Sequence, residues 1–105
     1  MSSAGAAGDA YEVHNSALIA QAFLRLQRQA AREGRGEELL QATRAVHERL
    51  RDNPTEFGEP LYQLPALRMS VRCAIVRPLV IDFAVCEDRP VVFIKAVRLL
   101  AAQEN

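Results

Sequence analysis

Three apolar runs in the second half of the chain decide the fold: LRMSVRC at Leu67–Cys73, LVIDFAVC at Leu79–Cys86 and VVFIKAVRL at Val91–Leu99. All three are rich in β-branched and aromatic residues, which suit a pleated strand, and the first alternates apolar and polar residues with period two. Short segments with turn-forming residues separate the runs. The sequence therefore predicts a three-stranded antiparallel β meander with one apolar face to bury.

The alternation also predicts which residues face the core. On the core face we expect Met69, Val71, Leu79, Ile81, Phe83, Val85, Phe93, Val97 and Leu99. The other face would then be open and would carry Arg68, Ser70, Arg72, Asp82, Ala84, Ala96 and Arg98. Lys95 interrupts the alternation of the last run, so a one-residue change of register would replace Arg98 by Lys95 as the basic residue of that strand.

The first half of the chain predicts a short strand and a pair of helices. Tyr11 to His14 alternates like a strand, and Asn15 and Ser16 offer an N-cap for a helix that Gly34 ends. A second helix is expected from about Glu37 and must end before Pro54. The apolar stripes of these helices consist of Ile19, Ala22, Phe23, Leu26 and Ala30, then Leu39, Leu40, Thr43, Val46 and Leu50. We expect the helical hairpin to cover the apolar face of the meander, which makes the fold class α+β.

The length of 105 residues suits one domain, which we place at residues 11–100, after a disordered leader at 1–10 and before a flexible tail at 101–105. The 13 basic and 13 acidic residues cancel, so the total charge does not indicate a nucleic-acid partner. The sequence contains no apolar stretch of the roughly 18 residues that cross a bilayer and no secretion signal. We therefore expect a soluble cytoplasmic protein without a membrane partner.

Common catalytic and metal-binding patterns are missing from the sequence. Gly34 and Gly36 stand between two helices without the Lys-Ser or Lys-Thr of a phosphate-binding loop, and no serine stands in a nucleophile elbow. The spacing of Cys73 and Cys86 matches no common zinc site, and both are expected to be free thiols. We expect neither a metal nor another cofactor.

The arginines of the open face could hold phosphate groups through bidentate hydrogen bonds. Arg68 and Arg72 are four residues apart on one strand, about 13 Å, which corresponds to two phosphates rather than one. Alternatively, they pair with Asp82 or with helix carboxylates and only make an exposed sheet soluble. The residues alone leave both interpretations open.

The order of short strand, helical hairpin, lead-in and meander resembles the RelE/ParE toxin superfamily. The resemblance covers most of Tyr11 to Leu100, and it is carried by the basic strand LRMSVR and the hairpin PLVIDFAVCEDRPVVFIKAV. The lead-in contributes Pro54, Phe57, Gly58, Leu61 and Leu64. It implies a toxin of a type II toxin-antitoxin system with a cognate antitoxin as partner. RelE-like members cleave mRNA on the ribosome, whereas ParE-like members poison DNA gyrase.

For a RelE-like toxin the resemblance implies catalytic roles for Arg68, Arg72 and Arg98. It also implies RNA contacts through Arg68, Ser70, Arg72, Arg77 and Lys95. The catalytic set is incomplete, because Val80 and Leu100 stand where the family often has arginines; Arg77 and Arg98 are candidates to replace them. The alternatives are a non-nucleolytic ParE-like or degenerate toxin that binds a protein, and an interaction module outside the family whose sheet edge accepts a strand or helix.

Overall fold

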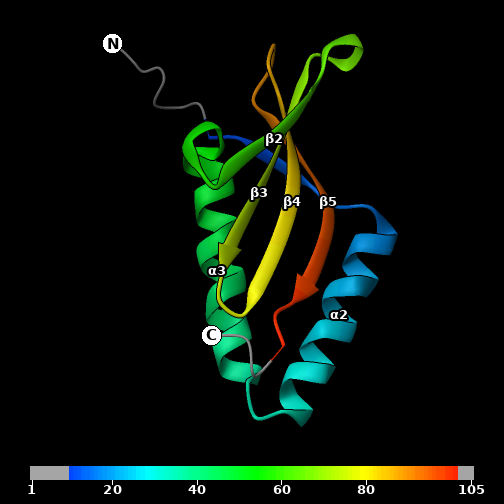
Figure 1. The fold of residues 1–105 in the computed structure, drawn as a ribbon, viewed down its shortest axis with the longest axis vertical. Helices are drawn as coiled ribbons and strands as arrows, with labels where there is room; N and C mark the ends of the chain where they lie inside the picture. The colour runs from blue at the N-terminus through cyan, green and yellow to red at the C-terminus, as the bar shows by residue number, and fades with distance from the viewer. Residues whose placement is uncertain (1–9, 102–105) are drawn as a thin grey trace.

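The structure, a computed structural model, describes residues 10–101. All but one residue of the predicted leader, and all but one of the predicted tail, lie outside the described residues. The elements in chain order are β1 (Glu12–His14), α2 (Ala17–Arg32), α3 (Gly36–Asp52), η1 (Pro54–Glu56), β2 (Glu59–Leu64), η2 (Pro65–Leu67), β3 (Met69–Val76), β4 (Leu79–Cys86) and β5 (Val91–Leu99). The fold class is α+β, as predicted, with two α-helices and one mixed sheet of five strands (Figure 1).

The two helices begin and end where the sequence predicts. The Ser16 hydroxyl accepts a hydrogen bond from the Ile19 amide at 3.2 Å and so caps α2. Gly34, with a φ of 76°, follows the helix in the left-handed conformation that glycine tolerates. In α3 the buried stripe is Leu39, Ala42, Val46 and Leu50. The predicted core residue Leu40 is instead 39% exposed, because helical spacing places it beside this stripe.

The predicted meander forms the centre of a larger sheet. Strands β3, β4 and β5 pair antiparallel, but β1 adds to β5 in parallel and β2 adds antiparallel to β3, which gives the order β1-β5-β4-β3-β2. The sequence predicts the lead-in only as turn-rich. Its two prolines hide a strand, because proline cannot donate to a ladder and is tolerated in edge strands such as β2.

Both helices contribute to one core on one face of the sheet. The predicted core face of β3 is wrong. In the observed register Ser70 pairs with Val85 and Arg72 with Phe83, and these partners belong to the core cluster. Met69 and Val71 therefore lie on the opposite face, together with Ala84.

The prediction for the last strand is correct at its end but not at its start. The register between β4 and β5 shifts once, so that Asp82 pairs with Ala96 and Phe83 pairs with Ile94, which leaves Lys95 as the extra residue of a β-bulge. As a result Ile94 joins the core, and Phe93 moves to the face that the helices leave open. The irregular position of Lys95 in the sequence is thus explained by the bulge.

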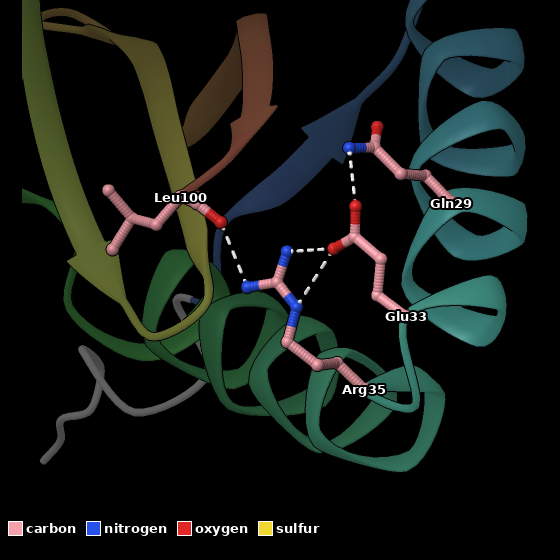
Figure 2. A network of polar contacts seen from close by, with 4 residues as sticks. All are labelled: Gln29, Glu33, Arg35 and Leu100. Carbon is pink, nitrogen blue, oxygen red and sulfur yellow. Dashed lines mark hydrogen bonds and ion pairs between the residues drawn. The ribbon is translucent and has the colours of Figure 1, made fainter. Parts of the chain in front are cut away.

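The loop between the helices is tied to the end of the sheet. Arg35 donates from Nη1 to the carbonyl of Leu100 at 2.8 Å and forms an ion pair with Glu33 (Figure 2). Glu33 also accepts from the Gln29 amide at 3.1 Å. This network joins segments that are 65 residues apart.

Candidate functional site

The open face of the sheet is the face that neither helix covers. Its residues are defined by the strand register, in four cross-strand rows. The rows are Leu64–Met69–Cys86, Tyr62–Val71–Ala84–Phe93–His14, Glu59–Cys73–Asp82–Ala96, and Ile75–Val80–Arg98.

The second row forms a shallow apolar trough with large side chains at both ends. Val71 and Ala84 in its middle are only 1% and 2% exposed, although they lie outside the main core cluster. Lys95 explains part of this cover, because its ammonium lies 3.4 Å from the hydroxyl of Tyr62. Since β4 and β3 separate these two residues in the sheet, the contact passes over the trough. At the other end the rings of Phe93 and His14 are 5.4 Å apart.

A polar row lies beside the trough. Cys73 and Asp82 are cross-strand neighbours, and a hollow of about 70 Å³ lies between Asp82 and Arg98. Burial raises the pKa of the Cys73 thiol, and a hydrogen bond to the Asp82 carboxylate and the negative charge of that group raise the pKa further. The positive charge of Arg98 acts in the opposite direction. The thiol therefore stays protonated at neutral pH, which does not suit a nucleophile.

Arg72, a predicted catalytic residue, points to the helix side of the sheet. Its Nε donates to the carbonyl of Phe57 at 2.8 Å, and its Nη2 donates to the carbonyl of Gly58 at 2.9 Å. The side chain thus holds the segment before β2 against β3. Ser70 lies on the same side, with its hydroxyl 3.1 Å from Oε1 of Gln63 and 3.3 Å from Oε2 of Glu87.

Two other predicted basic residues lie at opposite ends of β3. Arg68 precedes the strand with a left-handed φ of 55°, and its guanidinium lies 3.9 Å from Asp88. Arg77 comes after the strand, in the turn to β4. Because the strand has eight residues, their backbones are on the order of 25 Å apart. Only Arg98 and Lys95 of the predicted basic set lie on or beside the open face, so the structure does not bring that set together.

The open face can bind a partner more readily than it can carry out a reaction. It offers a small apolar floor, the aromatic residues Tyr62 and Phe93, and a mixed polar margin, which is a composition typical of protein interfaces. Within residues 10–101 no group of three His, Cys, Asp or Glu side chains is arranged to hold a metal ion. No helix in that range is long and apolar enough to cross a membrane.

Sequence reasoning misses Tyr62 as a residue of this face. Its signal is the alternation of Tyr62 and Leu64 with Gln63, but the prolines on both sides suggest a loop. It also misses Phe93, because the bulge at Lys95 changes the side on which the first residues of β5 lie.

Comparison with protein-family models, curated proteins and solved structures finds no match to the chain.

Proposed function

We propose that the chain is the toxin-like member of a type II toxin-antitoxin pair and acts by binding a protein target through its open sheet face. The family part of this proposal rests on the resemblance of the sequence and on the order of strand, helical hairpin and antiparallel strands. The observation that carries the mode of action is the trough between Tyr62 and Phe93, whose floor is apolar and nearly flat. An antitoxin encoded by a neighbouring gene is the expected inhibitor.

Binding is favoured over cleavage because phosphoryl transfer requires cations that converge on one phosphate. Arg72 is held by two carbonyl groups on the helix side, and Arg68 and Arg77 lie at opposite ends of β3. An apolar trough contributes little to the stabilisation of a charged transition state. The same trough can accept an apolar side chain of a protein partner.

Ribosome-dependent mRNA cleavage is the second candidate, and one observation favours it. Arg98 lies beside the hollow on the open face, with Asp82 opposite, and Lys95 projects from the adjacent bulge. Two cations on one face can contact successive phosphates of a single strand. In this second candidate function, Arg98 and Lys95 replace the arginines that the family often has elsewhere.

Inducible expression in a bacterial host separates the two candidates. We expect growth arrest while ribosome-bound messages stay intact by primer extension, and we expect the product of the adjacent open reading frame to relieve the arrest. Tyr62→Ala should abolish the effect. Leu67→Ala, which changes an equally exposed apolar side chain in η2 away from the trough, should leave it unchanged.

Other outcomes have defined meanings. Message cleavage that is lost in Arg98→Ala and retained in Tyr62→Ala would replace the binding proposal by the nuclease. DNA damage that depends on gyrase would identify a ParE-like target. A folded protein without any effect on growth would contradict the toxin assignment and favour a plain interaction module.

A further inference from the structure

A second surface with binding character lies on the outer side of the helical hairpin. Helices α2 and α3 pack against the sheet through one side each and leave a groove between their outer sides (Figure 1). The groove has a volume of about 440 Å³. It is lined by Asn15, Ala20, Phe23, Leu24, Gln27, Thr43 and His47. Because the helices separate the groove from the open sheet face, a partner bound in the groove is independent of the proposed function.

The residues along the groove repeat with the spacing of a helix–helix seam. On α2 the lining positions Ala20, Leu24 and Gln27 are separated by four and three residues. On α3 the lining positions Thr43 and His47 are separated by four residues, and Leu40 extends this row by three. This alternation is the one that presents side chains to a third helix lying along the groove. Leu24 remains 57% exposed, so the apolar surface of α2 exceeds what the sheet buries.

The borders of the groove are basic. Helix α2 carries Arg25, Arg28 and Arg32 and no carboxylate, and all three arginines are exposed. Arg28 lies one turn beyond Leu24, and on α3 Arg44 lies one turn beyond Leu40. Among the described residues neither Arg28 nor Arg44 has a carboxylate within ion-pair distance.

The carboxylates of α3 do not cancel this charge at the groove. Glu37 and Glu48 lie farther round the helix than Arg44, and Glu38 lies on the opposite side from Leu40. Asp52 is at the far end of α3. A second copy of this chain placed groove to groove would set arginine against arginine, which is unfavourable.

We propose that this groove is the docking site for an amphipathic helix of a partner protein, with an apolar seam and acidic residues on both flanks. The seam would cover Leu24 and Leu40, and the acidic flanks would pair with Arg28 on one side and Arg44 on the other. Surface charges of this kind set the choice of partner and the association rate more than the total affinity.

The test uses two labelled helical peptides of about three heptads, each with leucine at the seam. One carries glutamate and the other lysine at the flanking positions, and each is kept dilute so that it does not pair with itself. Fluorescence anisotropy with the full chain should show at least about tenfold tighter binding of the glutamate peptide, with a preference that shrinks at high salt. Leu24→Asn should weaken this binding about tenfold. Leu18→Asn, a matched change at an exposed leucine of α2 outside the groove, should not.

The charge assignment has its own control. The double variant Arg28→Glu/Arg44→Glu should reverse the preference toward the lysine peptide, and circular dichroism should confirm that each variant is folded. Equal binding of both peptides, no binding of either, or equal losses from Leu24→Asn and Leu18→Asn would overturn the proposal. Self-association that Leu24→Asn abolishes would assign the groove to a second copy. Tighter binding to vesicles rich in anionic lipid than to the glutamate peptide would assign it to a membrane surface.

Discussion

Arg72 illustrates how the same residue type can serve structure instead of catalysis. A charged side chain on the helix side of a sheet is costly unless its donors are satisfied, and the carbonyls of Phe57 and Gly58 accept two of them. The chain before β2 is thereby held in place. The predicted role of Arg72 in RNA binding remains untested, but its geometry accounts for the residue without RNA.

We expect Arg72→Ala to destabilise the fold by about 2 to 4 kcal/mol, because two hydrogen bonds from a charged donor are lost. Urea unfolding followed by circular dichroism measures the change. Arg68→Ala is the matched control, since Arg68 is exposed and lies 3.9 Å from Asp88; its effect should stay within about 0.5 kcal/mol. Equal effects of the two substitutions would show that the carbonyl contacts of Arg72 contribute little.

Two glycines with similar backbone angles allow a second comparison. Gly58 has a φ of 72°, and a Cβ there would lie 2.3 Å from the backbone oxygen of Cys73. Gly34 has a φ of 76°, but a Cβ there would meet no atom within 4 Å. Gly58→Ala should therefore cost at least about 3 kcal/mol, because backbone must move. Gly34→Ala should cost about 1 kcal/mol, the penalty of the left-handed conformation alone.

The same urea titration compares the two glycine variants. A cost for Gly58→Ala no larger than that for Gly34→Ala would mean that β2 does not approach β3 as closely as described.

At the scale of elements, the bulge in β5 decides which side chains reach each face. The extra residue Lys95 keeps Ile94 and Val97 on the core face, whereas strict alternation would place them on opposite faces. It also places Phe93 in the trough and brings Lys95 next to Tyr62.

Deletion of Lys95 should therefore be tolerated, because it leaves a regular alternation from Ile94 through Leu99. We expect a loss of about 1 kcal/mol, which reflects the changed twist and the lost contact with Tyr62. Deletion of Ala84 from β4 is the control, since the central strand has no extra residue and every residue on one side of the deletion would change face. Thermal unfolding should show a cooperative transition for the first variant and none for the second. A Lys95 deletion that abolishes folding would contradict the bulge.

The elements also show where pattern reasoning succeeds. The sequence predicts helices α2 and α3 with their ends because capping depends on residues close together in the chain, such as Ser16 and Ile19. Composition predicts the strands β4 and β5. It does not predict the buried face of β3, because the charge of Arg72 suggests solvent, and its acceptors come from a segment 14 and 15 residues away in the chain.

At the scale of the whole molecule, one polar network joins the helical hairpin to the end of the sheet. Arg35 connects Glu33 with the carbonyl of Leu100, and thereby ties the turn after α2 to the chain beyond β5 (Figure 2). The hydrogen bond from Arg35 lowers the pKa of the Glu33 carboxyl, and the hydrogen bond from Gln29 lowers it further.

This lowered pKa gives a pH dependence with a defined sign. A carboxyl whose pKa is lower in the folded state stabilises the fold fully above its ordinary pKa, and this stabilisation is lost as the pH falls through the lowered value. Glu33→Gln should therefore be less stable than the parent protein at neutral pH, and the difference should shrink on acidification. Urea midpoints measured from roughly pH 7 to pH 2 test this. Glu48→Gln, a similarly exposed residue of α3, should show a smaller difference; a Glu33→Gln effect independent of pH would contradict the proposed cause.

The sequence by itself determined the fold class, the two helices with their ends, and the three central strands, because these depend on short-range spacing and on local capping. Only the tertiary structure decided which face of β3 is buried, that β2 joins the sheet, and that Lys95 forms a bulge. These features depend on pairing between distant segments, and no local pattern encodes the partner. For the same reason the predicted cluster of arginines separates into residues at the ends, on the helix side and on the open face, and the candidate binding face is an apolar trough.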